Sequence, residues 1–163
     1  MKIALSSDHA GFSALQRLQR FLERGGYECL NYGPELYDPL DDYPDFIREA
    51  AKVVASGECK YGIIFGGSGQ GEAIVANRTP GVRCGVYYGP ANPLKTLDAE
   101  GSEASDEYEI LRLNRTHNDA NMLSLAGRFL DQAAIEKAVA VWLETPFSNE
   151  DRHLRRIGKI DSK

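Results

Sequence analysis

The sequence of 163 residues lacks the features that mark disulfide-rich, metal-binding, secreted and membrane proteins. Its three cysteines, Cys29, Cys59 and Cys84, are odd in number and scattered, which argues against a disulfide framework and against the paired spacing of a zinc or redox motif. No apolar run is long enough to cross a membrane, and no secretory signal precedes the strand-like residues 2–7. We therefore expect a cytoplasmic protein with reduced thiols and no membrane partner.

The chain also lacks an excess of basic residues. Its 24 acidic and 19 basic residues give a formal net charge of -5 at pH 7, which disfavours a nucleic-acid partner. The fractions of hydrophobic residues, 42%, and of charged residues, 26%, are those of an ordinary globular protein. The length is that of one domain, which we expect to span residues 1–163.

Strand-like and helix-like segments alternate along most of the chain. Apolar runs of strand length occur at residues 3–7, 27–31, 61–66, 82–88 and 122–126. This alternation predicts an α/β fold around a five-stranded parallel sheet, for which 2-1-3-4-5 is a common strand order. Residues 89–106, rich in Gly, Pro, Asn, Ser and acidic residues, are expected to form a surface insertion. Residues 149–163 are expected to form a basic C-terminal helix or tail.

One stretch concentrates most of the chemical signal. The third apolar run ends in Gly66-Gly67-Ser68-Gly69-Gln70-Gly71-Glu72, which places four glycines within six residues, and such turns expose N–H groups that bind anions. It fits neither a dinucleotide fingerprint, because Glu72 replaces the last glycine, nor a P-loop, because no lysine follows. A plain tight turn with a favourable first-turn acid is one interpretation. Four glycines exceed what a turn requires, and a carboxylate beside N–H donors suits abstraction of a carbon-bound proton, with the donors holding the oxyanion.

Three further groups are open to both a chemical and a structural interpretation. Asp8-His9 follows the first predicted strand and could be an acid–base pair or a plain helix entry, but the expected strand order places it opposite the glycine-rich loop. His117 precedes the fifth predicted strand, and a lone histidine is more often structural. The basic residues after position 150 could be a solvated helix face or a phosphate clamp. Arg128, directly after the fifth predicted strand, would lie at the same rim of the sheet as the other loops.

Several short motifs, taken together and in order, are more specific than any of them alone. They are Ser7-Asp8-His9-Ala10-Gly11, Asp42-Tyr43-Pro44, the stretch from Gly66 to Glu72, Ala76-Asn77-Arg78, His117-Asn118-Asp119-Ala120-Asn121 and Arg152-His153-Leu154-Arg155-Arg156. In this combination the chain resembles the type B ribose-5-phosphate isomerases, within the sugar-phosphate isomerase family that includes galactose-6-phosphate isomerase subunits. The resemblance covers nearly the whole chain except residues 89–106. It implies a Rossmann-like three-layer α/β/α fold, a homodimer or tetramer with shared active sites, and neither metal nor organic cofactor.

The resemblance also implies roles for individual residues. Many members carry a cysteine base where this chain has Gly66, but a second branch carries Gly-Gly-Ser-Gly-x-Gly-Glu, which makes Glu72 the base, assisted by Ser68. Asp8 would handle hydroxyl protons of the substrate, and His117 would assist opening of the sugar ring. The expected substrate-binding residues, of which the arginines bind phosphate, are His9, Tyr43, Gly67, Gly69, Gly71, Asn118, Arg128, Arg152 and Arg156.

The residues and the resemblance together imply a cofactor-free aldose–ketose isomerase that works through a cis-enediolate, most simply on ribose 5-phosphate and ribulose 5-phosphate. The same chemistry on a tetrose or hexose phosphate is an alternative, because the insertion lies next to His117 in the sequence. A non-catalytic sugar-phosphate-binding subunit is a second alternative. The joint presence of Glu72, Asp8 and His117 argues against it.

Overall fold

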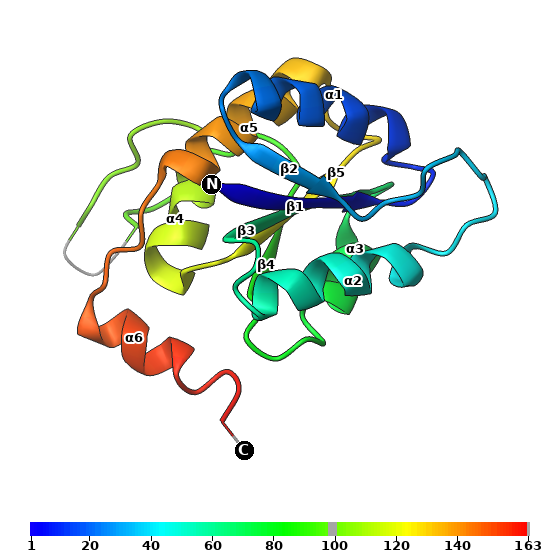
Figure 1. Cartoon of the computed structure of the whole chain (residues 1–163). Helices are drawn as coiled ribbons and strands as arrows, with labels where there is room; N and C mark the ends of the chain where they lie inside the picture. Colours follow the sequence, from blue (N-terminus) through cyan, green and yellow to red (C-terminus); the bar gives the residue numbers. More distant parts are fainter. Residues whose placement is uncertain (98–100, 163) are drawn as a thin grey trace.

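The computed structural model describes residues 1–97 and 101–162, and a sheet of five parallel strands lies at its centre (Figure 1). The strands are β1 (Lys2–Ser7), β2 (Glu28–Asn31), β3 (Tyr61–Gly66), β4 (Cys84–Tyr87) and β5 (Met122–Ala126). The helices are α1 (Phe12–Arg24), α2 (Tyr43–Ala55), α3 (Gln70–Ala76), α4 (Glu109–Asn118), α5 (Gln132–Glu144) and α6 (Asp151–Ile157). The predicted α/β alternation is confirmed. Residues 98–100 of the predicted insertion lie outside the described residues, as does residue 163 of the predicted tail.

The strands lie in the order β2-β1-β3-β5-β4, so the predicted order 2-1-3-4-5 is wrong for the last two strands. β5 is buried along its whole length, whereas three of the four residues of β4 are only partly buried. A fully buried strand needs a neighbour on each side, and the half-exposed β4 therefore takes the edge. The register pairs Gly66 with Ala126, which brings the chain that follows β5 beside the loop that follows β3.

Helices cover both faces of the sheet, which confirms the three-layer arrangement. α1, α4 and α5 share one core that contains Trp142, and α2 and α3 share a second core that contains Ile47 (Figure 1). Successive residues of β3 serve the two cores in turn, since Ile63 and Phe65 belong to the first and Ile64 to the second. In such a sheet, ligands bind at the carboxyl ends of the strands, where the winding direction reverses between β1 and β3.

The segment between β4 and α4 contains no helix or strand among its described residues. Arg112 of α4 holds its last part through a bidentate ion pair with Asp106, in which two guanidinium nitrogens each lie 2.7 Å from a carboxylate oxygen. The hydrogen bonds from Arg112 lower the pKa of Asp106 to about 2. α6, the helical part of the predicted basic C-terminal segment, contacts α4. None of the helices in the described ranges combines the length and apolarity needed to cross a membrane.

All three cysteines are free thiols. Burial raises the pKa of Cys29 to about 11 and also raises the pKa of Cys59 and Cys84. A thiol with a raised pKa carries little thiolate near neutral pH, so none of the three is an activated nucleophile.

Candidate active site

The glycine loop, residues 66–71, follows β3 at the carboxyl edge of the sheet. Gly69 has a φ of 75°, a left-handed conformation that other residues rarely adopt. A Cβ at this position would also lie 2.9 Å from Ser124 Oγ, which donates a 2.7 Å hydrogen bond to the Gly69 carbonyl. The loop is therefore tied to β5, and the chain turns directly into α3 at Gln70.

Glu72 lies in the first turn of α3, and its side chain folds back over Gly66. Only 5% of Glu72 is exposed. A Cβ built on Gly66 would fall on the Glu72 carboxyl group, so the carboxylate occupies the space that a side chain at position 66 would need. Burial raises the pKa of Glu72, a hydrogen bond from its own backbone N–H opposes the rise, and the nearby carboxylate of Asp8 adds to it. A carboxyl group with its pKa shifted toward neutrality is suited to take up and return a proton.

Asp8 and His9, at the end of β1, lie next to β3 and its loop. Asp8 is 6% exposed and accepts a 2.9 Å hydrogen bond from the backbone N–H of Ala10. His9 Nδ1 lies 2.6 Å from Oδ1 of Asp41, and this hydrogen bond is the largest cause of a raised pKa of His9. The structure thus brings Asp8 and His9 to the glycine loop, as the expected switch point implies. The sequence contains no signal for Asp41, because nothing in its spacing relates it to His9.

Three other predicted residues lie on this edge. Tyr43, the first residue of α2, packs against Gly71, where a Cβ would come within 2.8 Å of the phenol group. Arg128 follows β5, its backbone N–H donates to the Gly67 carbonyl at 3.2 Å, and its side chain runs past Gly67. Ser68 is half-buried within the loop. The carboxyl-edge cluster consists of the glycine loop with Asp8, His9, Tyr43, Glu72 and Arg128.

The remaining predicted residues gather around α4 and α6. The imidazole of His117 stacks on that of His153, with ring centroids 4.2 Å apart and planes inclined by 18°. His153 is 3% exposed, and burial lowers its pKa, with His117 adding to the effect. Asn118 and Arg156 line the same hollow as the two rings, which has a volume of about 260 Å³. No separate role for His153 is predicted from the sequence. The amino-edge cluster consists of His117, Asn118, Arg152, His153 and Arg156.

A single chain does not bring these two clusters together. α4 ends at Asn118 and leads into the amino end of β5, whereas the glycine loop leaves the carboxyl end of β3, its neighbour in the sheet. A strand of five residues, such as β5, spans about 17 Å, which sets the scale of the separation. Figure 1 shows α4 and α6 on the side of the molecule where β1 begins, whereas α3, the helix that contains Glu72, lies toward the end of β1.

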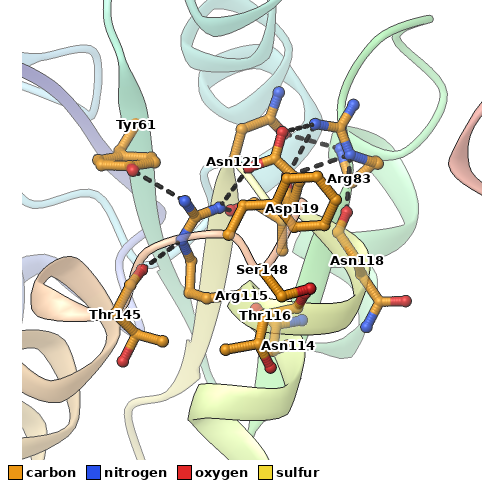
Figure 2. Close-up of polar contacts among 12 residues, drawn as sticks. Tyr61, Arg83, Asn114, Arg115, Thr116, Asn118, Asp119, Asn121, Thr145 and Ser148 are labelled. Carbon is orange, nitrogen blue, oxygen red and sulfur yellow. Dashed lines mark hydrogen bonds and ion pairs between the residues drawn. The ribbon is translucent and has the colours of Figure 1, made fainter. Parts of the chain in front are cut away.

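Two arginines hold the turn that follows α4 (Figure 2). Asp119 has a left-handed φ of 42°, and one carboxylate oxygen lies 3.0 Å from Arg115 while the other lies 3.0 Å from Arg83. Arg115 is 3% exposed and also donates to the Tyr61 hydroxyl at 2.9 Å. Arg83 donates to the carbonyl of Asn118 at 2.9 Å. This network fixes the backbone of the amino-edge cluster, although no motif in the sequence marks either arginine.

In the described part of the chain, one group of three residues could place ligand atoms around a metal ion. These atoms of Asp8, His9 and Asp41 lie within 4.8 Å of one another. The 2.6 Å between His9 Nδ1 and Asp41 Oδ1 is a hydrogen-bond distance, and two atoms each about 2.0 Å from one tetrahedral zinc ion would lie farther apart. The arrangement is therefore that of a hydrogen-bonded pair.

Comparison with known proteins places the chain in a family of sugar isomerases. The family model described as Ribose/Galactose Isomerase matches residues 3–93 and 100–160. Ribose-5-phosphate isomerase B of Mycolicibacterium paratuberculosis is 35% identical over 157 residues, covering 96% of this chain and 87% of that protein. The structure of ribose-5-phosphate isomerase B from Clostridium thermocellum has a TM-score of 0.83 and 36% identity, covering 98% of this chain and 95% of that one.

A further solved structure, ribose-5-phosphate isomerase B from Mycoplasma genitalium with bound ribulose-5-phosphate, also has a TM-score of 0.83. Its identity to this chain is 29%, and the match covers 98% of this chain and 93% of that one. Both matches to solved structures therefore extend over nearly the whole chain. On these grounds the chain belongs to the ribose/galactose isomerase family.

Proposed function

We propose that this protein interconverts ribose 5-phosphate and ribulose 5-phosphate, with Glu72 as the base. The observation that carries the proposal is the Glu72 carboxylate, buried over Gly66 with a raised pKa at the carboxyl edge of a parallel sheet. The names of the relatives support a pentose phosphate as substrate, since they match nearly the full length of the chain. The relative that holds ribulose-5-phosphate supports the ketose as product.

The carboxyl-edge cluster offers the groups that this reaction needs. Glu72 takes the proton from C2 of the open-chain aldose, the C–H electron pair forms the C1–C2 double bond, and the C1 oxygen becomes an oxyanion. The backbone N–H groups of residues 67–71, with Ser68, hold this oxygen. The protonated Glu72 then returns its proton to C1 as the C2 carbonyl forms. Asp8, beside Glu72, moves the proton lost by O2 to O1, so that atoms and charge balance.

A second copy of the chain completes the site in this proposal. The amino-edge cluster has the arginines and the histidine that suit phosphate binding and ring opening, but it lies at the wrong edge of its own sheet. A two-fold dimer could pair the amino-edge cluster of each copy with the carboxyl-edge cluster of the other. The phosphate would then lie between His9 and Arg128 of one copy and Arg152 and Arg156 of the other, with His117 at the sugar ring.

The test is isomerisation in deuterated water with a panel of ribose 5-phosphate, a tetrose phosphate and a hexose 6-phosphate. We expect ribulose 5-phosphate that carries solvent deuterium at C1. Glu72→Gln keeps the shape of the side chain but removes the base, so turnover should fall about 1,000-fold or more while affinity for inorganic phosphate stays the same. Near-normal turnover of Glu72→Gln would exclude Glu72 as the base. Turnover of only the tetrose or the hexose phosphate would identify that sugar as the substrate in place of ribose 5-phosphate. No turnover of any sugar would favour a non-catalytic subunit.

A further inference from the structure

The segment between β2 and α2 contains Asp41, whose carboxylate contacts His9 of the carboxyl-edge cluster. We propose that Asp41 is a positioning residue for phosphate recognition, which orients the His9 ring and keeps it cationic so that His9 presents Nε2–H to the anion. The proposal rests on the proposed function in one respect only, the identity of the anion as a sugar phosphate.

The contacts of Asp41 converge on a single residue. Its Oδ1 accepts hydrogen bonds from both the backbone N–H of His9, at 3.0 Å, and the ring Nδ1, at 2.6 Å. The Asp41 side chain is only 7% exposed, and its Oδ2 is buried without a hydrogen-bond partner in the described structure. A buried carboxylate is stable only when an opposite charge compensates it, and His9 is the group in contact with it. The environment of Asp41 therefore favours a protonated His9.

The same contacts decide which ring nitrogen meets the ligand. With Nδ1 bound to Asp41, the proton on Nε2 is the one that His9 can offer to an anion. The His9 side chain is 25% exposed, more than three times the fraction of Asp41, so the ring reaches the surface while its partner does not. This is the arrangement in which a buried carboxylate orients an imidazole that acts on a ligand.

The charges that surround His9 come from three elements, and together they favour the cation. The Asp41 hydrogen bond raises the pKa of His9 most, burial lowers it, the carboxylate of Asp8 directly after β1 raises it, and Arg128 beyond β5 lowers it. Asp8 Oδ2 lies 3.9 Å from Nδ1, and the ring of Tyr37 packs edge-on with its centroid 6.5 Å away. The net rise leaves His9 charged at pH values where an ordinary histidine is neutral. His9 and Arg128 then form a pair of cations on one rim, which suits a phosphate dianion.

The experiment compares Asp41→Asn with Asp38→Asn, which removes an exposed carboxylate from the same segment. Asn at position 38 can still accept the 2.9 Å hydrogen bond that Asp38 takes from the Leu40 backbone N–H. The probe is sulfate, whose charge is constant over the pH range, and its dissociation constant is measured for the full chain by calorimetry. At a pH above the ordinary histidine range at which His9 of the unmodified protein is still charged, Asp41→Asn should weaken sulfate binding on the order of tenfold, because its neutral His9 no longer donates a charge-assisted hydrogen bond. At about pH 5.5 the difference should vanish, because His9 is protonated in both proteins.

A second measurement uses the unmodified protein and does not depend on a variant folding. The chain has three histidines, so the ring signals in a nitrogen NMR titration are few enough to be assigned by through-bond correlation to the backbone. We expect His9 to titrate above the ordinary value of about 6.5 with Nδ1 protonated throughout. An ordinary or lowered titration point, an unprotonated Nδ1, or equal weakening by Asp41→Asn and Asp38→Asn would overturn the proposal. A protein that shows the expected titration but isomerises no sugar phosphate would instead refute the proposed function and leave the role of Asp41 in anion binding intact.

Discussion

Gly66→Ala is a small change that should disable the proposed base, Glu72, without replacing that residue. The added Cβ would fall on the Glu72 carboxyl group. Since Gly66 ends a buried strand, the backbone there cannot retreat, and the Glu72 side chain has to rotate away. A displacement of about 1 Å from a reactive geometry can cost on the order of 100-fold in rate, so we expect at least that loss in the turnover of ribose 5-phosphate.

The reasoning also predicts how the loss arises. The displaced Glu72 leaves a site where burial raises its pKa, so the acid limb of the pH–rate profile should move to lower pH in Gly66→Ala. The affinity for sulfate should not change, because the atoms nearest to the added Cβ belong to Glu72 and not to a residue proposed to bind phosphate. Far-ultraviolet circular dichroism and the urea midpoint check that the fold persists.

A double-mutant cycle decides whether Glu72 is the target. If Gly66→Ala acts through Glu72, then adding it to Glu72→Gln should cost little further activity, since the base is already gone. Losses that multiply, or a Gly66→Ala protein with nearly full turnover and an unshifted acid limb, would refute the steric argument.

Two further predictions concern the amino-edge cluster. Mixed expression of Glu72→Gln with His117→Ala should restore about a quarter of the normal activity. Half of random dimers contain one chain of each kind, and one of the two sites in such a dimer is intact. No restoration would mean that each site lies within one chain. Arg115→Met should lower the free energy of unfolding by about 3 kcal/mol, because it removes the charge partner of one Asp119 carboxylate oxygen and the donor to the Tyr61 hydroxyl. Arg17→Met, at an exposed arginine, should change it by less than about 0.5 kcal/mol in the same urea titration, and equal losses would contradict the role of the network.

The sequence was sufficient for the strand–loop–helix at Gly66 to Glu72 and for the approach of Asp8 to it. Glycine density and apolar runs are local signals, and β1 and β3 are neighbours in the common parallel orders. The order of β4 and β5 was not predictable in the same way, because both strands are short and apolar. The burial of both faces of β5 decides it, and that burial exists only in the folded chain.

The two clusters show a similar limit. The position of His117 just before a parallel strand already places it at the amino edge, so its separation from Glu72 follows from chain order alone. The pairing of Asp41 with His9 spans 32 residues and leaves no periodic trace. The stacking of His117 on His153 likewise depends on how α6 packs on α4, which no local pattern encodes.

The overlap between position 66 and the Glu72 carboxylate also limits how such a site can change its base over evolutionary time. A chain of this design cannot acquire a side chain at position 66 while Glu72 keeps its place, because the two groups need the same volume. In the proposed mechanism, losing Glu72 first leaves no base in the loop, and gaining a side chain at position 66 first displaces Glu72. Either order passes through a poor catalyst, so an exchange needs both codons to change together or a duplicate gene that carries the activity meanwhile. A glycine at 66 and a glutamate at 72 are therefore one heritable unit rather than two independent positions.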